Sequence, residues 1–525
     1  MRKTLGFTVA LSLACGSALF AQDSAAPLDA TAPRSALDPA RDYGPVQTKQ
    51  YDDGSVYVGT FVDGVQEGTG TYTLPSGYEY SGEWVKGEIK GLGRARYPNG
   101  SIYVGAFSEG KPQGRGKITF GDGGSYEGIW QNGKMTGEGE ARYANGAVYR
   151  GGFKDGVHDG KGVMTDASGY RFEGDWVLGA KQGLGKITYP DGTTYDGTLV
   201  DNAREGKGSL TMPNGLTYVG AWKAGQINGL GKLTQPNGDV YEGDFIEGLR
   251  AGKGTLSYAN GDLYKGGFKA DKRDGQGKFT AKDGTTYDGA WVAGQMQGEG
   301  VMRYPDGAIY AGGFRADQPD GIGKITYADG SFYEGTWQGG AITGSGKAAY
   351  PNGTAYEGSF VSARPEGIGT MTYPDGFRYE GAWKAGLREG QGLGIWADGS
   401  RYSGSFVAGK REGKGLLEQP DGFRYEGDWL GGEISGQGRA VYPNGDIYEG
   451  GFVSGKREGL GKLTYKAKGD VSEGIWKAGV LVGPAPTPAP DPAPTPAPAT
   501  VPAPEPQSPD APAAEAGTGT GTGTP

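Results

Sequence analysis

The sequence predicts an all-β protein. We expect an elongated, twisted, single-layer antiparallel sheet of about 18–19 stacked β-hairpin repeats, with disordered termini. Three observations support this fold class: a strict 23-residue repeat, an aromatic pattern of period 2, and a turn motif in nearly every copy. Residues 333–355, YEGTWQGGAITGSGKAAYPNGTA, show all three features. The opening tyrosine returns every 23 residues from Tyr57 to Tyr448, with Phe172 as one substitute.

The first half of each repeat is expected to be a strand with its aromatic side chains on one face. Tyr333, Gly335 and Trp337 alternate with other residues, and a period of 2 places them on the same face. The glycine leaves room for aromatic rings to lie over bare backbone. The same structural anchors recur in other copies, for example Tyr103, Gly105, Phe107, Tyr126, Gly128, Trp130, Tyr379, Gly381 and Trp383.

The second half of each repeat is expected to be the partner strand of a hairpin. Gly344 and Gly346 precede a short run that ends at Tyr350, and Pro351–Gly353 then forms a turn signal. Glycine accepts a positive φ without steric cost, so Pro/Asn/Asp-Gly between two strand-like runs favours a tight turn. A lone hairpin is only marginally stable. Stability is therefore expected to come from stacking each hairpin on the next, with capped ends.

The combined motif resembles a known repeat family. Tyr-x-Gly-x-Trp/Phe-x-x-Gly-x-x-x-Gly-x-Gly, followed by Tyr-Pro-Asp/Asn-Gly, is similar to the MORN repeat (membrane occupation and recognition nexus) over residues 51 to about 480. The resemblance, to a secreted bacterial type, implies scaffolding, dimerisation and attachment to membranes or other proteins. MORN arrays also occur fused to lipid kinases and methyltransferases. We expect no such domain here, because the segments outside the array are short.

A second period lies inside the first. The aromatic residue after the glycine alternates between Phe and Trp, and the residue five positions later alternates with it. Five residues after Phe the chain mostly has Arg or Pro, as at Arg411, whereas five residues after Trp it mostly has an apolar residue. This predicts a 46-residue unit with one loop partly buried and the next solvated; the alternative is duplication of a two-repeat cassette without structural meaning. The apolar positions are candidate interaction loops: Ile89, Met135, Ile227, Met296, Ile342 and Ile434.

The ends of the chain differ from the array. Residues 1–21 have the layout of a secretory signal peptide, with Arg2 and Lys3 before an apolar run, and a retained membrane anchor is the alternative. Cleavage before Cys15 would instead give a lipoprotein. Residues 22–50 are expected to be an Ala/Pro/Asp-rich linker, 51–483 the repeat array, and 484–525 a disordered tail. Alternating prolines favour an extended polyproline conformation for the tail, as a spacer or as a ligand for another protein or the cell wall.

The sequence offers little material for catalysis. The net charge is −9, and no segment has the basic excess that nucleic-acid binding needs. The only histidine, His158, is expected to be a surface substitution, and the only cysteine lies in the predicted signal peptide. We therefore expect no metal, no cofactor and no catalytic site. The repeated acids alternate with Lys and Arg, which is typical of a solvated face.

Three functions remain after these exclusions. The leading hypothesis is a non-enzymatic scaffold of the cell envelope or periplasm that binds proteins, with self-association, as a homodimer, through its open sheet edges. The second is association with a membrane or a glycan surface through rows of aromatic side chains. The third is a hydrolase-like enzyme, which lacks a histidine placed to activate its hydroxyl groups.

Overall fold

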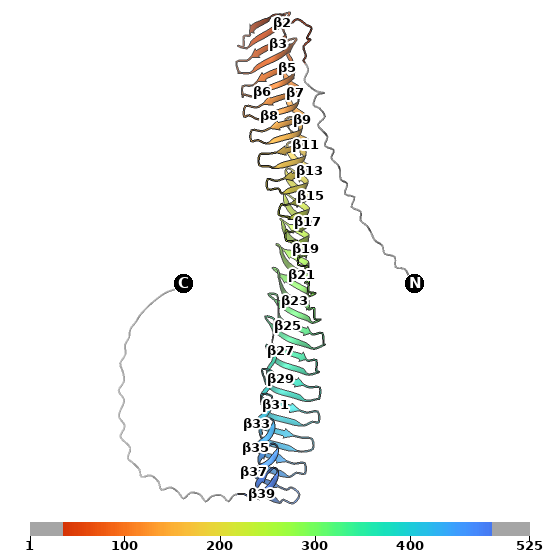
Figure 1. Ribbon diagram of the computed structural model, residues 1–525, viewed down its shortest axis with the longest axis vertical. Coiled ribbons are helices and arrows are strands. Elements are labelled where there is room, and N and C mark those ends of the chain that lie inside the picture. Colours follow the sequence, from red (N-terminus) through yellow and green to blue (C-terminus); the bar gives the residue numbers. More distant parts are fainter. Residues whose placement is uncertain (1–34, 486–525) are drawn as a thin grey trace, which may run out of the picture. The chain divides into compact units, whose positions relative to one another are not determined.

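The structure is a computed structural model that describes residues 35–485. The predicted signal peptide, Cys15 and nearly all of the tail lie outside the described residues. Residues 35–485 contain strands and turns but no helix, and 39 strands belong to one open antiparallel sheet (Figure 1). The predicted all-β, antiparallel fold class is therefore confirmed. The chain divides into two units, one ending at Pro374 and one beginning at Asp375.

In unit 1 each strand pairs antiparallel with the strands before and after it. The first strand is short: β1, Val46–Gln50. The seven-residue strands are β2 Val56–Val62, β4 Glu79–Val85, β6 Ile102–Ser108, β8 Ser125–Gln131, β10 Val148–Lys154, β12 Arg171–Val177, β14 Thr194–Val200, β16 Thr217–Lys223, β18 Val240–Ile246, β20 Leu263–Lys269, β22 Thr286–Val292, β24 Ile309–Arg315, β26 Phe332–Gln338 and β28 Ala355–Val361. The nine-residue strands are β3 Val65–Thr73, β5 Glu88–Arg96, β7 Lys111–Thr119, β9 Lys134–Arg142, β11 Val157–Thr165, β13 Ala180–Thr188, β15 Ala203–Thr211, β17 Gln226–Thr234, β19 Leu249–Ser257, β21 Lys272–Thr280, β23 Gln295–Arg303, β25 Gln318–Thr326, β27 Ala341–Ala349 and β29 Arg364–Thr372.

Unit 2 follows the same scheme. Its seven-residue strands are β30 Arg378–Lys384, β32 Arg401–Val407, β34 Arg424–Leu430, β36 Ile447–Val453 and β38 Val471–Lys477. Its nine-residue strands are β31 Leu387–Ile395, β33 Lys410–Glu418, β35 Glu433–Val441 and β37 Lys456–Thr464, and it ends with β39 Val480–Pro484.

Two kinds of turn connect the strands. A two-residue turn joins β26 to β27, with Gly339 at φ 53° and Gly340 at φ 80°, the left-handed pair of a type I′ hairpin. A longer turn joins β27 to β28, where the Tyr350 N–H donates to the Thr354 carbonyl at 2.8 Å. The side chain of Asn352 caps that turn by accepting the Thr354 N–H at 3.0 Å. Each repeat therefore contributes two strands, one short and one long.

The tyrosine ring of each repeat lies over a pair of glycines. In residues 333–355, a Cβ added to Gly346 would lie 2.5 Å from a ring carbon of Tyr333, so only glycine fits there. The ladder pairs Gly335 with Gly346 and then shifts at a β-bulge. The Tyr333 hydroxyl donates to the carbonyl of Thr336 in that bulge at 3.0 Å. Ring, glycine pair and bulge thus form one packing element that repeats along the sheet.

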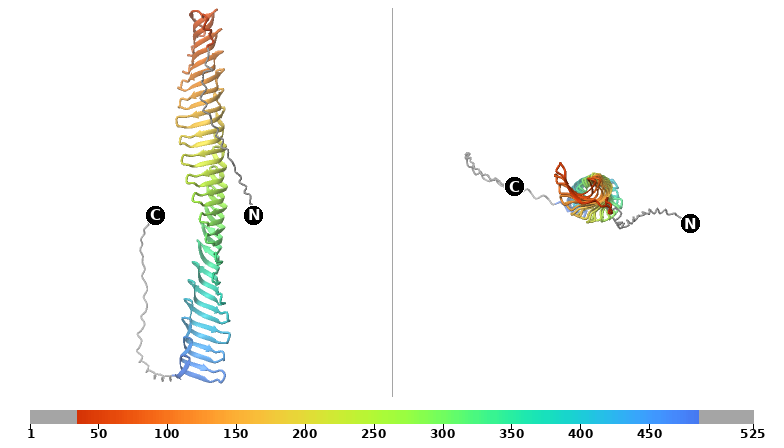
Figure 2. Two further views of the ribbon diagram at one scale, coloured as in Figure 1. Left: turned by 45° about the vertical axis from the view of Figure 1, so that its right-hand side comes forward. Right: turned by 90° about the horizontal axis from the view of Figure 1, so that it is seen from above.

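The sheet of unit 1 is strongly twisted. In Figure 2 the ends of its successive hairpins point in gradually changing directions from the red to the green part of the chain. Strands built from L-residues usually twist, in a right-handed sense along the strand. Aromatic side chains of neighbouring repeats pack against one another on one face of the sheet, and this packing gives the single-layer sheet its core.

Candidate functional site

The predicted anchor residues form a buried ladder of aromatic rings within each unit, and Leu199 interrupts the ladder of unit 1. The ring of Tyr333 packs edge-on against Trp337 at 5.6 Å and against Phe360 of the next repeat at 5.0 Å. The Trp337 indole Nε1 also donates to the Gly323 carbonyl of the preceding repeat at 3.1 Å. Tyr333 is only 3% exposed and Trp337 only 7% exposed. These rings are therefore internal, and they do not form an accessible aromatic surface.

The six candidate interaction positions are strand residues and not loop residues. Each is the second residue of a nine-residue strand and pairs directly with the tryptophan of its own repeat, as Ile342 does with Trp337. The two-residue turn is complete before this position is reached. The other five lie in the same place, and all six are half-buried: Ile89, Met135, Ile227, Met296 and Ile434. Their proposed role in interaction stays a prediction.

The arginines of the alternate repeats are not solvated, contrary to the expectation for this position. Arg411 is half-buried and its guanidinium lies 4.1 Å from the ring centre of Trp429 in the next repeat. Its Nη2 donates to the carbonyl of Gly432 at 2.7 Å. The alternation therefore has a structural meaning. The side chain at this position packs toward the aromatic residue of the next repeat. That aromatic residue is mostly Trp where the side chain is Arg, and mostly Phe where it is Ile or Met.

The acid that follows such an arginine also has a structural partner. The Glu412 carboxylate accepts the backbone N–H of Gly431 at 2.8 Å, and Glu458 accepts that of Ala478 at 2.8 Å. Each N–H belongs to the two-residue turn of the following hairpin. A carboxylate or amide in this position thus holds the turn of the following hairpin. These acids therefore do more than form a solvated face.

Two hollows open on the aromatic face. The first, of about 590 Å³, lies in unit 1 and is lined by Trp84, Gly87, Glu88, Ile89 and Glu109, among others. The second, of about 500 Å³, lies in unit 2 at the same repeat positions. It contains the equivalent residues Trp429, Gly432, Glu433 and Ile434. Two of the six candidate positions, Ile89 and Ile434, therefore line a concave surface.

The reverse face of the sheet carries the exposed apolar residues. Leu184, Leu230 and Ile322 are each the central residue of a Gly-x-Gly motif and are 68%, 70% and 69% exposed. A groove of about 1400 Å³ runs over β7–β14 on this face. Its lining includes Leu184 together with charged residues such as Arg150 and Glu173. This row was not predicted from the sequence, although Leu or Ile between the two glycines in some repeats was a readable signal.

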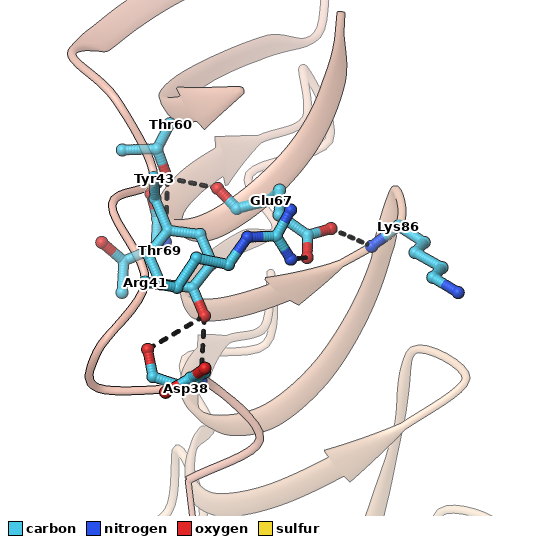
Figure 3. Close-up of polar contacts among 7 residues, drawn as sticks. All are labelled: Asp38, Arg41, Tyr43, Thr60, Glu67, Thr69 and Lys86. Carbon is cyan, nitrogen blue, oxygen red and sulfur yellow. Dashed lines mark hydrogen bonds and ion pairs between the residues drawn. The ribbon is translucent and has the colours of Figure 1, made fainter. Parts of the chain in front are cut away.

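An N-terminal segment, which we call the strap (residues 35–44), crosses the sheet near β2–β5. Arg41 Nη1 lies 3.0 Å from a carboxylate oxygen of Glu67, whose other oxygen accepts the Lys86 N–H at 2.6 Å (Figure 3). The Glu83 carboxylate accepts the Ala36 N–H at 2.6 Å. Glu67 and Glu83 are each only 7% exposed. Part of the segment 22–50 expected to be a linker therefore packs on the sheet, and Val46–Gln50 within it forms strand β1.

His158 occupies the position that mostly holds Arg or Pro after other phenylalanines. Its ring stacks on Tyr149 at 3.7 Å between ring centres, and its Nε2 is 2.7 Å from the Tyr143 hydroxyl. Burial lowers the pKa of His158 to about 4. The side chain is thus a neutral packing residue, more enclosed than a surface substitution would be. Residues 35–485 contain no group of His, Cys, Asp or Glu side chains that could hold a metal ion.

Comparison with known proteins identifies the family of the repeat. The model of the MORN repeat matches 18 consecutive segments, namely residues 57–77, 80–102, 103–125, 126–148, 149–169, 172–194, 195–217, 218–240, 241–263, 264–286, 287–309, 310–332, 333–355, 356–378, 379–401, 402–424, 425–447 and 448–468. The chain belongs to the MORN-repeat family. Its anchors Tyr333, Gly335 and Trp337 open one of these matched MORN repeats.

Similarity outside the MORN family model is weak. No curated protein matches the chain. Among solved structures, the TCP10 domain of Danio rerio CPAP in complex with a STIL peptide is 13% identical, over 51% of this chain and 93% of that one, with a TM-score of 0.20. Virginiamycin B lyase from Staphylococcus aureus is 10% identical, over 57% of this chain and 97% of that one, with a TM-score of 0.10. At TM-scores this low the likenesses carry no argument about this MORN-repeat chain. The described part of the chain has no helix suited to crossing a membrane.

Proposed function

We propose that this MORN-repeat protein is a non-enzymatic scaffold that binds other proteins through the reverse face of its sheet. The observation behind the proposal is the row of exposed aliphatic side chains at Leu184, Leu230 and Ile322. Leu184 also lines the groove of about 1400 Å³ on this face together with Arg150 and Glu173, and a concave surface that combines apolar and charged side chains suits a protein partner. On the aromatic face most rings are packed against one another, and the two hollows there are smaller, about 590 and 500 Å³.

The test changes the apolar row without touching the core. A variant with Leu184, Leu230 and Ile322 replaced by serine is compared with a control in which Lys207, Lys253 and Gln276 are replaced by serine. The control residues occupy the same Gly-x-Gly position in other repeats and are already exposed and polar. Envelope proteins that co-purify with the full chain should be lost from the first variant and kept by the control. Equal recovery by both variants would contradict the proposal.

Self-association through sheet edges is the second element of the proposal. The terminal strand β39 presents Val480 and Val482, 63% and 58% exposed, at an edge with unpaired backbone groups. The expected product is a homodimer. Light scattering at micromolar concentration should therefore give twice the chain mass, and a strict monomer would count against this element.

An alternative is association with a membrane or a glycan surface. It requires exposed rings, and Tyr143 and Tyr327, each 41% exposed, are the most accessible of the large aromatic side chains in the described chain. Binding to liposomes of anionic lipid, or to peptidoglycan, that is lost on replacing these two tyrosines with serine would favour this alternative. Failure of the intact protein to bind either material would remove it.

We infer an exported protein of the periplasm or cell envelope from the signal-peptide layout of residues 1–21, with lipidation of Cys15 as the alternative. No cofactor, metal or nucleic acid is part of the proposal. Fractionation of cells that produce the full chain, with and without Cys15→Ser, tests the location. A protein that stays in the cytosol and keeps the mass of the full chain would contradict export.

A further inference from the structure

The strap shows how the reverse face of the sheet holds a segment that is not a strand. Glu83 alternates with the aromatic anchors of β4, so its side chain lies on the reverse face, where its carboxylate accepts the Ala36 N–H at 2.6 Å. A Cβ added to Gly68 of β3 would lie 2.9 Å from Tyr43 Cβ. One added to Gly91 of β5 would lie 2.7 Å from Ala36 Cβ. The strap therefore passes from β3 to β5 as the chain is followed toward its N-terminus.

Burial on the reverse face follows the same path. The residues at the centre of the Gly-x-Gly motifs, from Thr69 to Leu460, are exposed in the matched repeats with two exceptions. The exceptions are Leu92 in β5 and Arg115 in β7, which are half-buried. Leu184, at the same position further along the array, is 68% exposed. Burial on this face therefore continues beyond β5 to β7.

The groove of about 1400 Å³ begins at that strand. Its lining runs from Arg115 in β7 to Asp196 in β14. Ile129, Val163 and Leu184 supply apolar surface within it, and charged side chains of the same strands lie among them. The volume exceeds the roughly 300–1,000 Å³ that is typical of small-molecule sites. The groove therefore has room for an extended polypeptide.

The residues before the strap resemble it in sequence. Residues 28–34 read LDATAPR, and residues 37–41 of the strap read LDPAR. Both stretches begin with Leu-Asp and end with arginine. In the strap, Leu37 is half-buried and Arg41 Nη1 lies 3.0 Å from a carboxylate oxygen of Glu67. Residues 28–34 thus carry the residue types with which the strap contacts the sheet.

The length of chain before the strap also matches the groove. Residues 22–34, if extended, span about 43 Å at about 3.3 Å per residue. The nine strand spacings from β5 to β14 amount to about 43 Å at about 4.8 Å each. A segment that continues the direction of the strap therefore reaches the far end of the groove.

We propose that residues 22–34 continue the path of the strap and occupy the groove over β7–β14. Leu28 is eight residues before Ala36, about 26 Å when extended, so it reaches the apolar stretch between Ile129 and Val163. The proposal goes beyond the scaffold function and bears on it. The segment and a protein partner would compete for Leu184, whereas the exposed residues beyond β14 stay accessible to the partner.

The test uses the full chain with the photo-cross-linker p-benzoylphenylalanine in place of Leu28. Cross-links mapped by mass spectrometry should fall within residues 115–196, and the same cross-linker in place of Val501 of the tail should not be enriched there. Val163→Lys should lower the yield from position 28 at least about threefold, because it places a charge on the apolar stretch. The lysine is tolerated by the fold, since Lys186 holds the same place in the next repeat. Val301→Lys, the matched change outside the groove, should leave the yield unchanged.

A second measurement needs no cross-linker. Deletion of residues 22–34 should speed acetylation of Lys161 and Lys186, which line the groove, at least about twofold if the segment is docked half of the time or more. Lys207 and Lys253, at exposed positions beyond the groove, should not change. Equal cross-linking from positions 28 and 501, an unchanged yield in Val163→Lys, or unchanged acetylation would each overturn the inference. Cross-links that join ¹⁵N-labelled to unlabelled chains in a mixture would overturn it in favour of the segment of a second copy.

Discussion

The packing of Tyr333 over Gly346 allows a sharp prediction for Gly346→Ala. The added Cβ would lie 2.5 Å from a carbon of the Tyr333 ring, and its three nearest neighbours are all atoms of that side chain. The ring cannot move freely, since it is buried, bonded to the Thr336 carbonyl at 3.0 Å and packed edge-on against Trp337 and Phe360. The clash must therefore displace several contacts together.

The cost can be estimated from these contacts. Overpacking a filled core costs about 1–3 kcal/mol. Weakening the tyrosine hydrogen bond adds about 1 kcal/mol, and disturbing the two edge-on ring pairs adds about 1 kcal/mol more. We expect Gly346→Ala to lower the local free energy of unfolding by about 3–5 kcal/mol. Gly340→Ala is the matched control, because no atom lies within 4 Å of its added Cβ. Its cost should be only the left-handed backbone at φ 80°, about 1 kcal/mol.

A repeat array does not unfold as one two-state unit, so the assay must be local. Hydrogen exchange of the β26–β28 amides reports the opening free energy of the affected repeat. A clash between the two residues also predicts coupling: in a Tyr333→Leu background, Gly346→Ala should cost at least about 1 kcal/mol less. Equal effects of Gly346→Ala and Gly340→Ala, or additive effects of Gly346→Ala and Tyr333→Leu, would refute this reasoning.

Four further predictions follow from single contacts. Burial lowers the pKa of His158 to about 4 from about 6.5 in the unfolded chain, so the unfolded state binds more protons between these pH values. Local stability, measured by pH-corrected hydrogen exchange, should therefore fall by on the order of 2 kcal/mol as the pH drops from 6.5 to 4. The variant His158→Gln should show no such dependence on pH. Arg411→Met should cost about 1–3 kcal/mol in the same assay, whereas Arg424→Met, at an exposed ion pair, should cost less than about 0.5 kcal/mol. Phe172→Tyr should gain about 0.5–1.5 kcal/mol by restoring the hydroxyl bond made by the other repeats, and a loss would contradict that role. Glu83→Ala should free the strap and speed limited proteolysis within residues 35–44, because it removes the oxygen that accepts both the Ala36 and the Leu92 N–H.

The repeat spacing was enough to predict the fold, because it specifies local geometry directly. Tyr333, Gly335 and Trp337 share a face by strand periodicity alone, and a glycine between two aromatic residues indicates that a ring lies over bare backbone. Turn boundaries were harder. The run of small residues before Ile342 predicts a loop there, whereas the turn uses only Gly339 and Gly340. A type I′ turn needs two left-handed residues and no more, which leaves Ile342 in the strand.

Contacts between repeats were beyond the reach of the sequence pattern. A solvated Arg411 was expected because arginine is usually exposed, yet it lies on Trp429 of the next repeat. That contact depends on the pairing register, which the spacing of 23 residues does not reveal. The same limit applies to Ala36 and Glu83, which are far apart in sequence and meet only through the path of the strap.

The pairing of Arg with Trp and of Ile or Met with Phe limits how such an array changes length during evolution. Loss or gain of one repeat would place Ile or Met against the Trp of the next repeat, or Arg against its Phe. Removal of two neighbouring repeats leaves every such match intact. The array has one place where two phenylalanines follow in succession, Phe245 and Phe268, and there Arg250 forms an ion pair with Asp271 at 3.1 Å. Chain lengths in close homologues should therefore differ mainly in steps of 46 residues.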